Sequence, residues 1–267
     1  MRREQLAQRY GPWVVVTGAS SGIGRGMAQE LAALGLNTVL VARGEEALRD
    51  LATELHEAYG IESRVIAADL ADLAEAKRVV DETIDLDIGL LVANAGYGTS
   101  GEFLDSELDI ELNMLAVNCL AVTVLTHSFG NRFKERGSGG VVLMSSISAF
   151  QGIARQANYA ASKAYVQSFG EGLRAELQPL GIEVLIAAPG PVESGFAARA
   201  DMQVDNAASA ETVASGIIGA LGKNSTVRPG FQSKLLGYGL STAPRRMRTR
   251  ILSGVIGGFT KHQVTSG

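Results

Sequence analysis

A tyrosine and a lysine in this sequence could together move a proton to or from an oxygen atom. Tyr159 and Lys163 stand four residues apart in Tyr-Ala-Ala-Ser-Lys, and this spacing places both side chains on one face of a helix. A free tyrosine, with a pKa of about 10, is a poor base at neutral pH, but a nearby ammonium group stabilises its phenolate. Such a tyrosine can exchange a proton with a carbonyl or alcohol oxygen. The pair alone is unspecific, and a surface contact explains it better.

Ser146 makes a catalytic interpretation stronger. It follows the apolar run 141–145, which is expected to be a strand, and it precedes Tyr159 by 13 residues. The strand end and the helix start can meet at the carboxyl edge of a parallel sheet, where open α/β folds bind ligands. A hydroxyl there can hydrogen-bond a substrate oxygen as charge develops on it. Ser145 is the neighbouring alternative, but successive strand residues point to opposite sides.

A glycine-rich turn predicts a phosphate site. The stretch Thr17-Gly18-Ala19-Ser20-Ser21-Gly22-Ile23-Gly24 joins an apolar run, 13–17, to an amphipathic helical pattern. Glycines there let the backbone approach a pyrophosphate, and the N-terminus of the helix neutralises it. A tight turn alone would explain the glycines, but the strand before and the helix after favour a nucleotide. The spacing TGxxxGxG differs from the phosphate loop GxxxxGK[ST], which disfavours kinase or ATPase chemistry.

The residue type after the second strand indicates which nucleotide binds. Ala42 and Arg43 stand where an acidic residue would bind a ribose 2′-hydroxyl. Arginine suits a 2′-phosphate because it offers a fixed charge and forked donors. The sequence therefore favours NADP(H), with NAD(H) less favoured. The alternative is that Arg43 is a solvated loop charge.

The elements that position these residues form a repeating pattern. Short runs rich in Val, Ile and Leu alternate with helical patterns, and their continuous hydrophobicity indicates strands covered on both faces. We expect an α/β fold, a doubly wound parallel sheet (Rossmann fold) with helices on both faces in a single domain. The expected strands are 13–17, 38–42, 63–67, 90–93, 141–145 and 184–187, with a last one near 226–228.

We divide the chain at residue 230. Residues 1–230 are expected to form the nucleotide-binding catalytic domain, including a substrate loop or short lid helices over 193–212. Residues 231–267 are expected to form a basic, amphipathic C-terminal extension.

Composition excludes several other classes of protein. The only cysteine, Cys119, cannot form an internal disulfide and lies in no metal-binding spacing, so we expect a reducing compartment and no metal. Residues 1–11 are polar and lack the apolar stretch of a signal peptide, and no 18 uncharged apolar residues run together. These features predict a cytoplasmic protein without a transmembrane segment.

The motifs together resemble those of the short-chain dehydrogenase/reductase family, in its TGxxxGxG/YxxxK branch. The similarity covers residues 12–230 and rests on motifs in the family's order and spacing: TGASSGIG, Asp69, Asn94-Ala95-Gly96, Asn118, Ser146, YAASK and Pro189-Gly190-Pro191-Val192-Glu193-Ser194. The family commonly has threonine at the position of Ser194, which keeps the hydroxyl.

The resemblance implies a role for each motif. Tyr159 would be the acid/base, Lys163 would lower its pKa and bind the nicotinamide ribose, and Ser146 would orient the substrate carbonyl. Asn118 would hold a water that links Lys163 to solvent, and Asp69 would contact the adenine amino group. The implied cofactor-binding residues are Gly18, Ser20, Ser21, Gly22, Ile23, Gly24, Arg43, Asp69, Leu70, Asn94, Ala95, Gly96, Tyr159, Lys163, Pro189, Gly190, Val192 and Ser194.

The activity we expect is that of an NADP(H)-dependent carbonyl reductase. Positions expected to face the substrate carry few charges, which suggests a lipophilic ketone such as a 3-oxoacyl or steroid-like compound, although packing under a loop explains them equally. These positions are Tyr97, Phe150, Gln151, Ile153 and Phe196. The alternative is a noncatalytic NADP-binding redox sensor or scaffold. The resemblance also implies a homodimer or homotetramer formed through helices 112–129 and 159–177.

The C-terminal region carries a separate charge signal. The whole chain has a net charge of −4, but residues 223–267 hold eight basic side chains and no acidic one. Apolar residues recur every fourth position from 247 to 259, which predicts a helix, and four arginines occupy its first turns: Arg245, Arg246, Arg248 and Arg250. Because a helix N-terminus favours anions, we expect these arginines to meet an external anion, such as a carrier phosphopantetheine, an acidic protein or peripheral contact with anionic lipid. Surface charge paired with acidic groups of the body is the equal alternative. Nucleic acid is not expected, because no reading module accompanies the charge.

Overall fold

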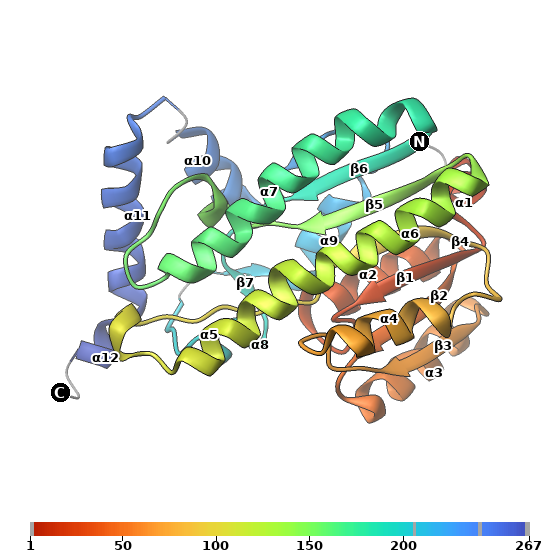
Figure 1. Cartoon of the computed structure of the whole chain (residues 1–267), viewed down its shortest axis with the longest axis horizontal. Coiled ribbons are helices and arrows are strands. Elements are labelled where there is room, and N and C mark those ends of the chain that lie inside the picture. The colour runs from red at the N-terminus through yellow and green to blue at the C-terminus, as the bar shows by residue number, and fades with distance from the viewer. Residues whose placement is uncertain (1–2, 205–206, 240–241, 265–267) are drawn as a thin grey trace.

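The computed structural model describes residues 3–204, 207–239 and 242–264. Its centre is a sheet of seven parallel strands in the order β3-β2-β1-β4-β5-β6-β9 (Figure 1). The strands are β1 (Trp13–Thr17), β2 (Asn37–Ala42), β3 (Ser63–Ala67), β4 (Ile88–Ala93), β5 (Gly139–Met144), β6 (Ile182–Ala187) and β9 (Thr226–Val227). The chain passes from β3 back to the middle of the sheet at β4, so the carboxyl ends of β1 and β4 flank the switch point where such folds bind ligands. The predicted doubly wound parallel sheet is confirmed.

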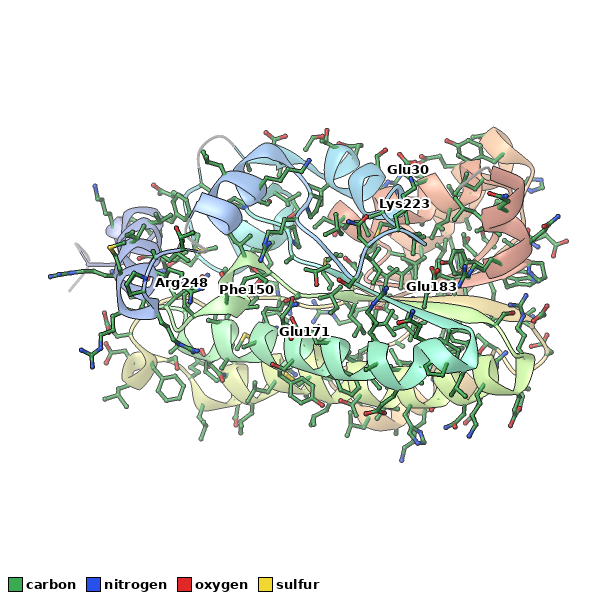
Figure 2. All side chains as sticks on the ribbon, turned by 90° about the horizontal axis from the view of Figure 1, so that it is seen from above. Glu30, Phe150, Glu171, Glu183, Lys223 and Arg248 are labelled. Atoms are coloured by element: carbon green, nitrogen blue, oxygen red, sulfur yellow. The ribbon has the colours of Figure 1, made fainter. Side chains whose placement is uncertain are left out.

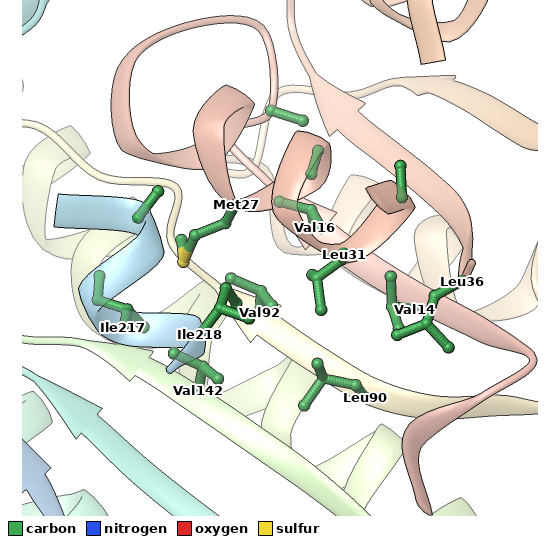
Figure 3. Close-up of a cluster of buried hydrophobic side chains, with 14 of the residues drawn as sticks. Val14, Val16, Met27, Leu31, Leu36, Leu90, Val92, Val142, Ile217 and Ile218 are labelled. Atoms are coloured by element: carbon green, nitrogen blue, oxygen red, sulfur yellow. The ribbon is translucent and has the colours of Figure 1, made fainter. Parts of the chain in front are cut away.

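Helices cover both faces of this sheet. One apolar cluster joins it to α2 (Gly22–Ala33), α3 (Glu45–Tyr59) and α9 (Ala210–Ile218), and Figure 3 shows Met27, Leu31 and Ile217 of these helices against strand residues. The second cluster joins the other face to α4 (Leu73–Asp81), α6 (Val122–Arg136) and α7 (Ala157–Leu177). Burial on both faces explains why the strands read as continuous apolar runs rather than alternating ones.

The N-terminal segment folds into a helix that the sequence did not predict. Helix α1 (Arg3–Tyr10) ends in Tyr10, which is fully buried and hydrogen-bonds Glu183 at the start of β6. A Cβ on Gly140 would lie 2.7 Å from the Tyr10 ring, and one on Gly89 would lie 2.6 Å from its carbonyl oxygen. Strands β4, β5 and β6 begin two residues earlier than expected, and Gly89 and Gly140, which precede the apolar runs of β4 and β5, are strand residues that pack against Tyr10.

A long helical stretch runs from α5 (Leu108–Leu115) through η2 (Ala116–Ala121) into α6. The middle segment, η2, has π-helical geometry, which is typical of functional sites. By length and composition the stretch could span a bilayer, although polar residues such as Asn113 and Asn118 interrupt its apolar run, and 39% of its most apolar window is buried within the chain. The buried apolar side chains of its α6 part, which include Leu125 and Phe129, belong to the core cluster under the sheet.

The C-terminal helices stand at the carboxyl edge of the sheet (Figure 1). Helix α10 (Phe231–Gly239) is followed by α11 (Arg245–Phe259) and α12 (Lys261–Val264). Leu252 and Ile256 of α11 pack on Ile153 and Ala160, with Phe259 beside them. The remaining short elements are η1 (Phe103–Asp105), η3 (Ile147–Phe150), η4 (Gln178–Leu180), β7 (Val192–Glu193), α8 (Gly195–Arg199) and β8 (Ala208–Ser209).

Candidate active site

The structure brings Ser146, Tyr159 and Lys163 together at the carboxyl edge of the sheet. Tyr159 lies in the first turn of α7, and Ser146 follows β5 directly as the N-cap of η3. The Ser146 hydroxyl accepts a hydrogen bond from the Ser148 amide at 3.1 Å, and it lies close enough to Tyr159 to lower the pKa of that phenol. Each of the three residues exposes less than a tenth of its surface. A substrate oxygen at this point would therefore meet two hydroxyl groups in a largely dry site.

Burial controls the protonation of the tyrosine and the lysine. It raises the pKa of Tyr159 to about 12, while the nearby Ser146 hydroxyl lowers this pKa. The pKa of Tyr159 therefore shifts upward, opposite to the lowering expected from the Lys163 ammonium, because burial is the dominant cause and Ser146 is the group that opposes it. Burial also lowers the pKa of Lys163 to about 8, against a smaller opposing effect of Cys119. At neutral pH the phenol is thus protonated and able to act as an acid.

Lys163 is held by the backbone rather than by a carboxylate. Its ammonium group donates to the carbonyl oxygen of Met144 at 3.0 Å and lies 5.9 Å from the centroid of the Tyr159 ring. The neighbouring serine, Ser145, donates its hydroxyl to the Lys163 carbonyl at 3.1 Å. Ser145 therefore anchors α7 to the sheet, whereas Ser146 is the serine at the tyrosine.

Asn118 lies in η2 and is fully buried. Its amide nitrogen donates to the carbonyl of Tyr97 at 2.9 Å and to the Ser162 hydroxyl at 3.0 Å, and its amide oxygen accepts from the Tyr97 backbone N–H at 3.1 Å. A Cβ on Gly96 would come within 2.8 Å of that oxygen and 3.2 Å of the Lys163 nitrogen. Asn118 thus positions the turn beside Lys163, and it does not line the cavity described below.

The glycine turn has little room for side chains. Gly18 and Gly22 have positive φ angles of 67° and 55°, which favour glycine. A Cβ on Gly24 would lie 2.2 Å from the Gly18 carbonyl oxygen and 2.5 Å from the amide nitrogen of Asn94. That amide donates to the Thr17 carbonyl at 2.9 Å and so ties β4 to the turn. The tight turn at the start of α2 is a cradle that fits a pyrophosphate.

One cavity of about 540 Å³ connects this turn with the tyrosine. Every residue predicted to bind the cofactor lines it except Gly24, which packs beneath the turn. Arg43 and Asp69 lie at the end formed by β2 and β3, and Ser194 of the lid approaches Gly22, whose Cβ would be 2.9 Å from that of Ser194. The donor set and the glycine cradle fit a dinucleotide. Among the described residues, no group of His, Cys, Asp and Glu side chains could hold a metal ion.

The substrate end of the cavity differs from the expectation. Tyr97, Ile153 and Phe196 line the cavity, as predicted, and the Phe196 ring lies 5.4 Å from that of Tyr159. The prediction was wrong for Phe150 and Gln151. Phe150 stacks under Arg228, whose guanidinium carbon is 4.6 Å from its ring centroid, and the Gln151 amide turns back to the Ile147 carbonyl. Figure 2 labels Phe150 within this part of the molecule.

The sequence also missed several residues that line the cavity. Most are apolar and come from α11 and the lid: Leu252, Val255, Ile256, Phe259, Met202 and Val204. The four-residue repeat in α11 was the available signal, but it does not tell which partner the apolar face meets. Arg199, at the end of α8, is a further residue that the sequence did not single out.

Comparisons with known proteins agree with this geometry. The profile of the family described as short chain dehydrogenase matches residues 12–205. A 7beta-hydroxysteroid dehydrogenase from Clostridium sardiniense is 34% identical over 68% of this chain and 70% of its own length. A very-long-chain 3-oxoacyl-CoA reductase from Anas platyrhynchos is 32% identical over 91% of this chain and 79% of its own. An inactive hydroxysteroid dehydrogenase-like protein 1 from Homo sapiens is 35% identical over 68% of this chain, which spans only 56% of that protein.

Solved structures extend the similarity to three dimensions. A short-chain dehydrogenase from Sphingobium yanoikuyae in complex with NADPH has a TM-score of 0.78 at 29% identity, covering 82% of this chain and 87% of its own. A 7beta-hydroxysteroid dehydrogenase structure has a TM-score of 0.85 at 25% identity, covering 92% and 98%. The profile match covers more than half of the sequence and includes the glycine turn, Ser146, Tyr159 and Lys163. The chain therefore belongs to the short-chain dehydrogenase family.

Proposed function

We propose that this protein is an NADP(H)-dependent oxidoreductase that interconverts a ketone and a secondary alcohol. One observation carries the proposal: a protonated, buried Tyr159, with Ser146 beside it, lines a cavity that leads to the glycine turn. Proton transfer at Tyr159 and a dinucleotide at the turn are the two parts that carbonyl reduction requires.

The residues of this chain would handle the oxygen and its proton. A bound nicotinamide supplies the hydride that reduces the carbonyl carbon. The Ser146 and Tyr159 hydroxyls hold the carbonyl oxygen, and Tyr159 donates its proton to that oxygen as negative charge develops there. Lys163, with its ammonium facing the ring, stabilises the resulting phenolate until a proton returns. Asn118 would contribute by holding a water on the path from Lys163 to solvent.

Arg43 supports NADP(H) as the cofactor. It is exposed at the end of β2 and lines the cavity, where its guanidinium could pair with a 2′-phosphate. The similar Sphingobium enzyme was solved with NADPH, which agrees with this choice. Asp69, exposed at the end of β3, would contact the adenine.

The substrate proposed is an apolar ketone, with 3-oxoacyl and steroid-like compounds as candidates. The substrate end of the cavity is lined by apolar side chains of the lid and α11, which suit such a compound. The names of two similar proteins, a hydroxysteroid dehydrogenase and a 3-oxoacyl-CoA reductase, describe substrates of these classes.

The test is a panel of ketones assayed by consumption of NADPH, in parallel with NADH. We expect apolar ketones to be reduced with NADPH. Tyr159→Phe should lower turnover by at least about a thousandfold while NADPH still binds. Tyr165→Phe is the matched control, because Tyr165 is exposed and its hydroxyl contacts only Thr123 among the described residues. Unchanged turnover in Tyr159→Phe would refute the mechanism.

A noncatalytic NADP-binding sensor or scaffold is the second candidate. It is favoured by the similarity to hydroxysteroid dehydrogenase-like proteins named as inactive. Against it stand the assembled Ser146, Tyr159 and Lys163. NADPH binding without reduction of any ketone in the panel would support the sensor and exclude the reductase for those substrates.

We also propose that the protein is a cytoplasmic homodimer or homotetramer. The helices of the expected interface, which span α5 to α7, expose Leu112, Leu120 and Tyr165 by 53%, 50% and 42% of their surfaces. Large exposed apolar groups on neighbouring helices are typical of subunit contacts. Sedimentation at micromolar concentration, with Leu120→Glu as the disrupting variant, tests this assembly.

The outer face of α11 is proposed to contact an anionic surface or carrier. Arg245, Arg246 and Arg250 are exposed there, together with Met247 and Ile251, whose exposed fractions are 49% and 40%. None of the ion pairs within the described residues includes these arginines or Arg248, which Figure 2 labels on this helix. Absence of binding to anionic vesicles at low salt would remove the lipid version.

A further inference from the structure

Arg199 is a charged residue of the cofactor cavity to which neither the sequence motifs nor the proposed mechanism gives a role. It is the last residue of α8, the short helix that follows Ser194 in the lid. It lines the same cavity as Arg43, which comes from a different element, at the end of β2. Within residues 3–204, 207–239 and 242–264, no ion pair includes either arginine. Two cations therefore line one cavity from different elements.

The Tyr97 ring holds the Arg199 guanidinium in place by stacking. The guanidinium carbon lies 3.9 Å from the centroid of the Tyr97 ring, a stacking distance for a cation on an aromatic face. The ring itself is held by its hydroxyl, which donates to Asn113 at 2.7 Å and contacts the Ile110 carbonyl at 3.1 Å. Tyr97 exposes only 7% of its surface. Arg199 is thus placed by a rigid neighbour, unlike an arginine that extends freely into solvent.

The electrostatics of this end of the cavity favour a bound anion. The pKa of Arg199 is lowered first by burial and then by the charge of Arg43, while Asp69 opposes the shift weakly. Like charges in one cavity repel, and a multiply charged anion between them would relieve that repulsion. The pyrophosphate would lie at the N-terminus of α2, among Ser20 to Ile23, so the anion near Arg43 and Asp69 belongs to the adenosine end of the cofactor.

We propose that Arg199 binds the 2′-phosphate of NADP(H) from the lid side, together with Arg43, so that the lid itself recognises the phosphate. This inference rests on the proposed use of NADP(H) and extends it. Stacking on Tyr97 leaves the edge of the guanidinium, where its donors lie, free to meet phosphate oxygens. Lid closure then becomes tighter with NADP(H) than with NAD(H), because only the former carries the group that joins the two arginines.

Calorimetric titration of the apo protein with four ligands tests the assignment. The ligands are NADPH, NADH, 2′,5′-ADP and 5′-AMP, and the variant is Arg199→Gln, with Lys77→Gln, at an exposed position on α4, as the control for loss of a positive charge outside the cavity. We expect Arg199→Gln to weaken NADPH and 2′,5′-ADP by about tenfold and NADH and 5′-AMP by less than twofold. The control should change all four by less than twofold.

The possible outcomes distinguish failure of the Arg199 assignment from failure of the proposed use of NADP(H). If the unmodified protein binds 2′,5′-ADP no better than 5′-AMP, the choice of NADP(H) fails, and the role of Arg199 fails with it. If the unmodified protein prefers the 2′-phosphate but Arg199→Gln changes nothing, Arg199 is not a ligand. An equal loss of NADPH and NADH would assign Arg199 to the pyrophosphate or to the lid fold and overturn the inference.

A second pair of variants tests whether the Tyr97 ring positions Arg199. Tyr97→Phe keeps the aromatic face under Arg199, and Tyr97→Leu removes it. We expect the ratio of the NADPH and NADH dissociation constants to stay within twofold in Tyr97→Phe and to shift by about threefold toward NADH in Tyr97→Leu. If Tyr97 has only a structural role, both affinities should change together and their ratio should stay constant in both variants. That result would contradict the idea that the Tyr97 ring positions Arg199.

Discussion

The two halves of the cavity are built in different ways. The cofactor half consists of backbone: the turn from Gly18 to Gly24 fits against Asn94 with no room for added carbon atoms. The substrate half consists of side chains from the lid and α11, joined to the body by a small apolar cluster around Ile153. A site made of backbone restricts its sequence strongly, whereas a site made of apolar side chains accepts many combinations of similar volume. The residue types of the glycine turn are therefore constrained by geometry, whereas those of the substrate half are constrained only in volume and polarity.

Filling the cofactor half should have the largest effect. A Cβ at Gly24 would lie 2.2 Å from a backbone oxygen, so Gly24→Ala must displace the turn. We expect a loss of about 3 kcal/mol or more in the free energy of unfolding, together with loss of NADPH binding, measured by urea denaturation and calorimetry. In the control, Gly172→Ala in α7, the new Cβ meets nothing within 4 Å, so stability should be unchanged or higher by up to about 1 kcal/mol. Equal effects of the two variants would contradict the idea that close backbone packing at Gly24 shapes the cofactor half of the cavity.

Lys163, between the halves, should show a pH-dependent effect. Burial lowers its pKa to about 8 from the ordinary value of 10.5, so the folded state binds fewer protons than the unfolded state between these values. The cost of burying the charge is present in full below pH 8 and disappears as the pH rises to 10.5. Relative to Lys163→Met, the unmodified protein should gain about 3 kcal/mol of stability across that window.

Urea denaturation of both apo proteins at a series of pH values measures this gain. Other groups titrate in both proteins and cancel in the difference. A difference that stays constant with pH would show that Lys163 is not desolvated, and the site would then be more open than the structure indicates.

Truncating the substrate half should have the smallest effect on the fold and a selective effect on activity. Ile256 of α11 is nearly buried and lines the cavity, so Ile256→Ala should cost about 2 kcal/mol, at the low end for isoleucine because the site borders an open cavity. The KM for apolar ketones should rise while the NADPH dissociation constant stays unchanged. Ile251→Ala, on the exposed side of the same helix, should alter stability by less than about 0.5 kcal/mol. A parallel loss of NADPH affinity in Ile256→Ala would show that the halves are not independent.

Much of the fold could be predicted from the sequence. Strands β1 and β3 were predicted with their observed ends, because buried parallel strands are apolar throughout and are bounded by turn residues. The positions of Ser146 and Tyr159 followed from the rule that strand ends and helix starts meet at one edge of the sheet. The glycine turn was equally accessible, since only glycine fits where the backbone is this close.

The remaining features depend on contacts between distant segments. Helix α1 is mostly polar, and the burial of Leu6 and the packing of Tyr10 over Gly89 and Gly140 attach it to the body. The apolar repeat of α11 predicted a helix but not that it would form a wall of the cavity. Arg199 carried no sequence signal, because its stacking on Tyr97 joins segments about a hundred residues apart.

The π-helical segment η2 has a consequence for how this helix can vary. A π turn holds an extra residue, so the helix before Asn118 and the helix after it differ in rotational phase. Winding residues 116–121 as an ordinary α-helix, with no residue removed, would rotate one half against the other by about 100°. The amide of Asn118 and the apolar face of α6 could then no longer both meet their present partners. The extra residue of the π turn thus sets the rotation between the two halves of the helix. With this rotation, Asn118 contacts the active-site turn while the apolar face of α6 packs on the sheet.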